Sequence, residues 1–121
     1  MAKNIMIVDD SASLRQVVGI ALKGAGYEVV EACDGKDALT KLDGRKIHLI
    51  ISDVNMPNMD GITLVKEVKK LPSYRFTPVI MLTTESQEAR KAEGRALGAR
   101  AWITKPFQPS QLVDAAARLC V

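Results

Sequence analysis

The chain has 121 residues, of which 47% are hydrophobic and 26% are charged. That length and apolar content predict one globular domain over residues 1–121, with no room for a second core. The net charge is only +3, and the aromatics (one Trp, two Tyr, two Phe) are not interleaved with basic residues. This pattern argues against nucleic-acid binding and favours an acidic protein partner. No segment has the length of a membrane span or the pattern of a signal peptide, so we expect a cytoplasmic protein without membrane insertion.

The cysteines and the single histidine do not indicate a metal site or a disulfide framework. Cys33 and Cys120 are far apart in the chain, and their spacing matches neither a zinc motif nor a disulfide-rich scaffold. Both thiols are expected to be reduced. His48 precedes an apolar run, and we interpret it as a partly exposed residue without a chemical role.

Short apolar runs alternate along the chain with segments of helical periodicity, which is typical of repeated βα units on a parallel sheet. The predicted strands cover residues 5–8, 28–32, 49–53, 79–82 and 101–104. The fold class is therefore predicted to be α/β, with a doubly wound, five-stranded parallel sheet.

The first predicted helix has the clearest apolar face and ends at Gly26. The second begins with Asp34 as its N-cap and ends at Gly44, and the third begins with Asp60 as its N-cap and ends before Pro72. The face of the first helix consists of Leu14, Val17, Val18, Ala21, Leu22 and Ala25.

The last two predicted helices differ in the strength of their apolar faces. The fourth has mostly alanine on that face (Ala89, Ala92, Ala96) and Gly94 in its interior, so it should be the least firmly docked. The fifth begins near Pro109, which suits a first helical turn. Its apolar face consists of Leu112, Ala115, Ala116 and Leu119.

Polar residues stand at the carboxyl ends of four predicted strands. Asp9 and Asp10 follow the first strand, Asp53 ends the third, Thr83 follows the fourth and Lys105 follows the fifth. Each has an ordinary explanation when taken alone: a helix cap, a loop carboxylate, a strand-end hydroxyl or an exposed lysine. In a parallel sheet, however, the carboxyl ends of the strands share one edge, where ligands bind.

Together, these side chains are suited to taking up a phosphoryl group. A carboxylate can form a covalent acyl phosphate, and Mg²⁺ prefers oxygen ligands such as carboxylates. Three carboxylates, one Mg²⁺ and Lys105 would give a pocket without net charge, and Thr83 is placed to hold equatorial phosphoryl oxygens. The sequence predicts a magnesium-dependent phosphoryl acceptor.

These motifs resemble those of a two-component response-regulator receiver domain, most of all the single-domain chemotaxis-type regulators. The resemblance covers nearly the whole chain and rests on Asp9-Asp10, Asp53 in Ser-Asp-Val-Asn-Met-Pro-Asn-Met-Asp-Gly, Thr83, and Lys105-Pro106-Phe107. It implies a (βα)5 flavodoxin-like fold and a signalling switch that accepts phosphate from a histidine kinase onto Asp53. Such a protein is a phosphoacceptor that catalyses its own phosphotransfer and autodephosphorylation, rather than an enzyme acting on a separate substrate.

The resemblance also implies roles for individual residues. Asp10 would bind Mg²⁺ directly and Asp9 largely through water, and the remaining ligands would be Asp53 and the backbone carbonyl of Asn55. Lys105, Thr83 and Thr84 would contact the phosphoryl oxygens, and the Lys105–Pro106 bond would be cis. Asn55 and Glu85 occupy the positions that tune hydrolysis in this family.

Signal output is expected to involve Thr83 and Trp102. In the family, an aromatic residue three positions before the lysine turns inward after phosphorylation and changes the surface formed by the fourth helix, fifth strand and fifth helix. Here that residue is Trp102, where the family usually has Tyr or Phe. Expected partners are a histidine kinase, a downstream target such as the flagellar motor switch, and a phosphatase, with the protein itself a monomer.

Three alternatives remain open. The protein could relay phosphate or act as a phosphate sink without a motor target. A metal-dependent phosphohydrolase would need an acid/base carboxylate two residues after its nucleophile, and Asn55 stands there. A flavodoxin-like mononucleotide binder would need a phosphate-binding loop after the first strand, where Asp9 and Asp10 would repel phosphate unless a cation intervened.

Overall fold

The computed structural model describes residues 3–83 and 99–119 of the chain. Within these residues the elements are β1 (Asn4–Val8), α1 (Ala12–Gly24), β2 (Glu28–Ala32), α2 (Gly35–Lys41), β3 (Leu49–Asp53), α3 (Gly61–Lys70), β4 (Val79–Thr83), β5 (Ala101–Thr104) and α5 (Pro109–Leu119). The strands form one parallel sheet in the order β2-β1-β3-β4-β5. This confirms the predicted fold, and every predicted strand is found to within one residue at each end.

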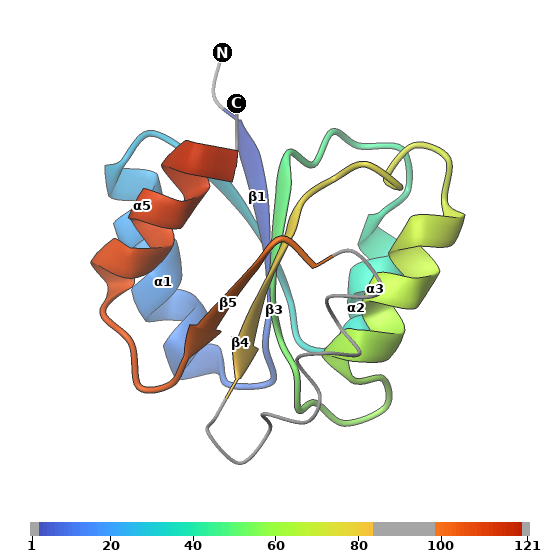
Figure 1. The fold of residues 1–121 in the computed structure, drawn as a ribbon, viewed down its shortest axis with the longest axis horizontal. Coiled ribbons are helices and arrows are strands. Elements are labelled where there is room, and N and C mark those ends of the chain that lie inside the picture. Colours follow the sequence, from blue (N-terminus) through green and yellow to red (C-terminus); the bar gives the residue numbers. More distant parts are fainter. Residues whose placement is uncertain (1–2, 84–98, 120–121) are drawn as a thin grey trace.

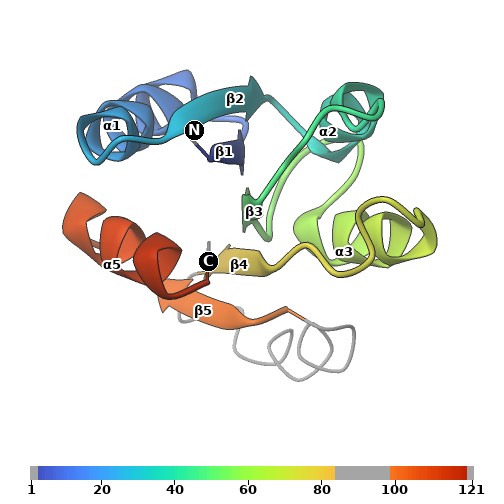
Figure 2. The same cartoon turned by 90° about the horizontal axis from the view of Figure 1, so that it is seen from above.

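Helices cover both faces of the sheet, as Figures 1 and 2 show, with α1 and α5 on one side and α2 and α3 on the other. The alternation of side chains along each strand produces this division. Ile5 and Ile7 of β1 pack in the cluster with α1 and α5, whereas Met6 and Val8 pack with α2 and α3. The near-continuous apolar sequence of β1 thus reflects burial on both faces.

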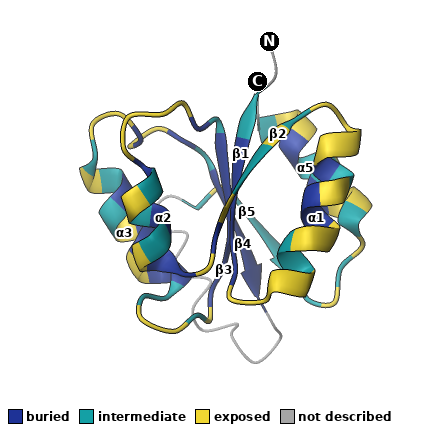
Figure 3. Ribbon diagram, turned by 180° about the vertical axis from the view of Figure 1, so that it is seen from behind, coloured by how far each residue is buried: buried dark blue, intermediate teal, exposed yellow. Residues whose placement is uncertain are grey.

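Burial is greatest in the middle of the sheet (Figure 3). All residues of β3 and β4 are buried, whereas the edge strands β2 and β5 are partly exposed. Functional side chains that leave the ends of β1, β3 and β4 are therefore supported by backbone packed on both faces.

The helix starts follow the predicted caps with one exception. The side chains of Asp34 and Asp60 accept hydrogen bonds from the backbone N–H groups of Asp37 and Thr63, as expected for N-caps. The cap of α1 is Ser11, so the ordinary explanation of Asp9 or Asp10 as helix caps is wrong. Both aspartates are left for another role.

The predicted apolar face of α1 was too wide. Val17 is 53% exposed and Ala25, which ends the helix as its C-cap, is also exposed. Val18 and Leu22 are buried against the sheet and α5. Because one helix contacts the sheet along a narrow stripe, a residue at the border of that stripe stays in solvent.

Some sequence predictions fall on residues that the structure does not describe. These are the fourth helix, with Ala89, Ala92, Gly94 and Ala96, and the thiol of Cys120.

Cys33 is a free, exposed thiol. His48 is partly exposed, as predicted, and its Nδ1 accepts a hydrogen bond from the backbone of Asn4. Among the described residues, no helix combines the length and apolar character that a membrane crossing requires.

Gly61 gives the first testable prediction, because α3 begins directly against the end of β3. A Cβ at Gly61 would lie 2.2 Å from the carbonyl oxygen of Asp53 and 2.6 Å from Cε of Met81. Since the first of these atoms is backbone, Gly61→Ala must displace the chain, and we expect a loss of about 2–3 kcal/mol in the free energy of unfolding.

Urea denaturation measures this loss, and Gly24→Ala is the matched control. A Cβ at Gly24 meets no atom within 4 Å, so this change should cost no stability. Equal effects of the two substitutions would contradict the prediction.

Candidate functional site at the carboxyl edge of the sheet

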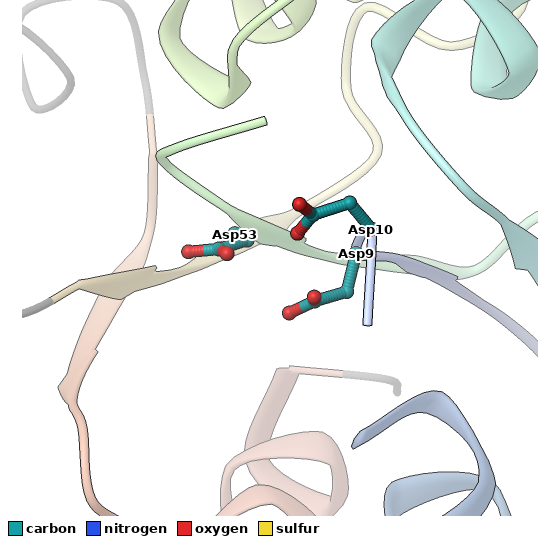
Figure 4. Close-up of side chains that lie close together, drawn as sticks. All are labelled: Asp9, Asp10 and Asp53. Atoms are coloured by element: carbon teal, nitrogen blue, oxygen red, sulfur yellow. The ribbon is translucent and has the colours of Figure 1, made fainter. Parts of the chain in front are cut away.

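The acidic cluster lies where the strand order reverses, between β1 and β3, which is the usual ligand site of an open α/β sheet. Asp9 and Asp10 follow β1, and Asp53 is the last residue of β3. One carboxylate oxygen from each residue lies within 4.8 Å of those from the other two, and Figure 4 shows the three side chains together. The structure thus brings together the three carboxylates that the sequence singled out.

Asp9 is the most deeply buried of the three, at 1% exposure. Its Oδ1 accepts a hydrogen bond of 2.8 Å from the backbone N–H of Ser11, but its Oδ2 is buried and has no hydrogen-bond partner among the described residues. Burial is the main cause that raises the pKa of this carboxyl group, and the negative charges of Asp53 and Asp10 add to it. Because burying a carboxylate oxygen without a donor is costly, a cation would be a favourable partner for this oxygen.

Lys105 reaches the cluster from β5. Its Nζ lies 3.1 Å from Oδ2 of Asp53 and 3.6 Å from Oδ2 of Asp9. Its backbone N–H donates to the carbonyl of Thr83 at 2.6 Å, and the Lys105–Pro106 bond is cis, as expected. Three carboxylates and one ammonium leave a formal charge of −2 in this space.

Two other predicted residues flank the cluster. Thr83 is fully buried at the end of β4. Asp53 pairs with Leu82, so Thr83 stands one residue beyond the level of Asp53 at the carboxyl edge. Asn55 is exposed, two residues after Asp53. Thr84 and Glu85 lie outside the described residues.

Trp102 lies within β5 beside Met81 of β4. It is partly exposed and packs against the core cluster shared with α2 and α3. Its Nε1 is buried and has no hydrogen-bond partner among the described residues. An indole nitrogen usually finds a partner when it is buried, and none of the described residues supplies one here.

Arg15 also belongs to the site, although no sequence pattern indicated it. Its Nη1 donates to the backbone carbonyl of Asp9 at 2.5 Å, and its Nε donates to Glu31 at 3.0 Å. Arg15 thereby ties the turn after β1 to β2. Glu31 lies near Arg15 because β2 pairs with β1, which places Glu31 beside Ile7. This contact joins residues that are far apart in the chain, so no local sequence pattern predicts it.

A second support, also missed, holds the loop after β3. Asn58 has a positive φ of 67°, a conformation that Asn tolerates better than most residues, and its Nδ2 donates to Asp34 at 2.7 Å. The backbone N–H of Gly35 donates to the carbonyl of Met59. The loop that carries Asn55 is thus fastened to the start of α2. The Pro57-Asn58 pair is the local signal, because Pro and Asn both favour turns.

An open apolar groove of about 710 Å³ adjoins the cluster. It lies between the start of α1 and the segment after β5, and its walls include Lys105, Leu14, Val17 and Phe107. Val17 is exposed to solvent, but it therefore lies on the wall of this groove.

The donor set fits Mg²⁺. Hard divalent cations take carboxylate and carbonyl oxygens, and the cluster offers three carboxylates, one of which has an unsatisfied buried oxygen. No second group of this kind occurs among the residues that the structure describes. A divalent cation would cancel the formal charge of −2.

Comparisons with known proteins agree with this geometry. A family model of the response regulator receiver domain matches residues 5–117. The chemotaxis protein CheY of Thermotoga maritima is 38% identical over 117 residues, which cover 95% of each protein. The solved structure of the chemotaxis protein CheY4 of Vibrio cholerae is 46% identical, with a TM-score of 0.92, and the match covers 98% of this chain and 99% of CheY4.

Other relatives are longer. The phosphate regulon transcriptional regulatory protein PhoB of Pseudomonas aeruginosa is 40% identical over 113 residues, which cover 93% of this chain and 49% of PhoB. The chain thus spans about half the length of PhoB and of a similar transcriptional regulatory protein from Bacillus subtilis. With a matching family model over most of its length and relatives of this similarity, the chain belongs to the response regulator receiver domain family.

Proposed function

We propose that this receiver domain is a phosphorylation-activated switch that takes a phosphoryl group from a histidine kinase onto Asp53. The observation that carries the proposal is the meeting of Asp9, Asp10 and Asp53 within 4.8 Å, with Lys105 3.1 Å from Asp53. Like charges repel, so the gathering of three carboxylates costs stability, and this cost supports a chemical role for the cluster.

Asp53 is the proposed nucleophile. One of its carboxylate oxygens attacks phosphorus of the donor phosphohistidine, a P–O bond forms, the P–N bond breaks, and the imidazole nitrogen keeps the electron pair and takes up a proton. Lys105 then balances negative charge on the phosphoryl oxygens, and the hydroxyl of Thr83 holds one of them, with Thr84 as a further contact.

Asp9, Asp10, Asp53 and the backbone carbonyl of Asn55 are the proposed ligands of Mg²⁺. The ion, when bound, neutralises charge between the carboxylates and the phosphoryl oxygens. Burial of Asp9 with an unsatisfied oxygen supports its part in this set. Asn55 and Glu85 are the proposed determinants of the lifetime of the phosphorylated state.

The proposed output is a change in the surface around β5 and α5, in which Thr83 and Trp102 move. CheY of T. maritima and CheY4 of V. cholerae are chemotaxis proteins by name, which supports a chemotaxis role with a motor-type target. PhoB is named a transcriptional regulatory protein, so the relatives differ in their targets, and a phosphorelay intermediate or phosphate sink stays the second candidate. A phosphatase partner, a monomeric state, a single domain and a cytoplasmic location stay predictions.

Phosphate transfer tests the proposal directly. A panel of histidine kinases labelled with radioactive phosphate is incubated with the protein and Mg²⁺, and label on the protein is followed by gel electrophoresis. We expect transfer to the unchanged protein and none to Asp53→Asn, because an amide is not a nucleophile for phosphorus. Asp43→Asn is the control, since Asp43 is an exposed aspartate paired with Arg45. Undiminished labelling of Asp53→Asn would refute the assignment.

Metal binding is tested by thermal unfolding at neutral pH. Two carboxylates about 5 Å apart repel by roughly 3 kcal/mol at an effective dielectric constant of 20, and Mg²⁺ removes this repulsion. We expect millimolar Mg²⁺ to raise Tm, by about 3–6 °C for each kcal/mol of stabilisation. In the absence of Mg²⁺, Asp9→Asn should also raise Tm, because it removes a buried negative charge, whereas Asp10→Asn should raise it less because Asp10 is exposed.

Asp9→Asn should also lose most of the response to Mg²⁺. A Tm that is indifferent both to Mg²⁺ and to Asp9→Asn would contradict the metal assignment.

The single tryptophan reports on the proposed switch. Trp102 is partly exposed and packs against the core, so a change in its burial should alter emission and acrylamide quenching. We expect such a change when Mg²⁺ and beryllofluoride, a phosphoryl analogue, are added together. In Asp53→Asn, the same addition of Mg²⁺ and beryllofluoride should leave emission and quenching as they were. If the fluorescence of the protein without substitutions does not respond to Mg²⁺ and beryllofluoride, Trp102 does not take part in the switch.

A further inference from the structure

A cluster of positive charge lies at the edge of the sheet opposite the acidic site. The strands run in one direction (Figure 1), and Lys46, Arg75 and Arg100 all lie in segments that enter β3, β4 and β5. Because parallel strands begin at one edge, these cations share the amino edge. We call Lys69, Arg75, Phe76 and Arg100 the amino-edge patch.

Contacts tie the members of the patch together. Nζ of Lys69 donates to the backbone carbonyls of Arg75 and Thr77 at 2.9 and 3.2 Å, which fixes the end of α3 to the turn before β4. The backbone N–H of Arg100 donates to the carbonyl of Val79. Burial, and to a lesser degree the positive charge of Arg100, lowers the pKa of Lys69.

Among the residues that the structure describes, no acidic side chain balances the positive charge of the patch. Arg75 and Arg100 are exposed, and no carboxylate of the described residues forms an ion pair with either of them or with Lys69. The other basic side chains nearby differ in this respect: Lys70 pairs with Glu67, and Arg45 pairs with Asp43. The patch thus keeps three like charges together without a counter-charge from the described chain.

Phe76 adds an apolar group to this charged surface. Its side chain is 84% exposed, and the guanidinium carbon of Arg75 lies 6.0 Å from the ring centroid. Large apolar side chains with so much exposure are few among the described residues, namely Val17, Ile20 and Phe76. An exposed aromatic beside arginine is typical of binding hot spots.

A hollow of about 420 Å³ adjoins the same turn. Its walls include Lys46, His48 and Tyr74. The Tyr74 hydroxyl donates to the carbonyl of Arg45 and accepts from the N–H of Gly44, which holds the wall in place. Nδ1 of His48 accepts a hydrogen bond, so its Nε2 carries the ring proton and is a further donor.

We propose that the amino-edge patch docks an acidic protein segment that carries an apolar side chain. Carboxylates of the segment pair with Arg75 and Arg100, its apolar side chain packs on Phe76, and a further carboxylate meets Lys46 and His48 in the hollow. One exposed aromatic offers too little apolar surface for membrane insertion, and nucleic acid would need more stacking residues than the single Phe76. This surface is separate from the phosphoryl site, so docking does not require phosphorylation.

Fluorescence anisotropy with a labelled short peptide of alternating glutamate and leucine tests the proposal on unphosphorylated protein. We expect saturable binding that weakens with added salt. The double variant Arg75→Glu, Arg100→Glu should weaken it by at least about tenfold. The matched control is Lys23→Glu, Lys36→Glu, which changes the net charge equally at exposed positions of α1 and α2 and should bind as the unchanged protein does.

Phe76→Ser separates the apolar contribution from the charge. It should weaken binding of the glutamate and leucine peptide but not of a peptide in which serine replaces leucine. Circular dichroism checks the fold of each variant, and Asp53→Asn should bind normally, which keeps this test independent of the phosphoryl-acceptor assignment.

Three results would overturn the proposal. The first is an absence of saturable peptide binding. The second is an equal loss in the two charge-reversed double variants, which would make net charge the cause. The third is binding to phosphatidylserine vesicles or duplex DNA by a protein that does not bind the peptide.

Discussion

The arrangement on which the rest of this structure depends is the gathering of three carboxylates at the switch point of the sheet. Each pair of like charges at about 5 Å costs roughly 3 kcal/mol at an effective dielectric constant of 20. Lys105 contacts two of the carboxylates and offsets part of that cost, but a formal charge of −2 remains. Asp9 is nevertheless held in a buried position by the N–H of Ser11. Such a cluster is poor for stability and well prepared for a cation and a phosphoryl group.

The surrounding fold holds these charges in place through backbone contacts. Asp53 ends a strand that is buried on both faces, and the absence of a Cβ at Gly61 lets α3 begin against its carbonyl. Arg15 holds the carbonyl of Asp9, and Asn58 fastens the following loop to Asp34. None of these residues needs to touch a phosphoryl group, yet each limits where the carboxylates can lie. Precise placement of reacting groups depends on such supporting contacts.

The two edges of the sheet carry opposite chemistry. Acidic residues and Lys105 gather at the carboxyl edge, and basic residues gather with Phe76 at the amino edge. β5 connects the two, because Arg100 precedes the strand, Trp102 lies within it and Lys105 follows it. A movement of this partly exposed edge strand would therefore affect both surfaces, whereas the fully buried β3 and β4 provide a fixed frame.

The sequence by itself determined the strands, the caps of α2 and α3, and the acidic residues of the site, because these depend on local periodicity and on the residue types at strand ends. It placed Asp9, Asp53 and Lys105 correctly at one edge, since parallel strands leave no other arrangement. Tertiary structure alone decided that Asp9 is buried while Asp10 is exposed, that Ser11 caps α1, and that Val17 stays in solvent. It also brought Arg15 to Glu31 and Asn58 to Asp34. These outcomes depend on contacts between segments far apart in the chain, which local patterns do not encode.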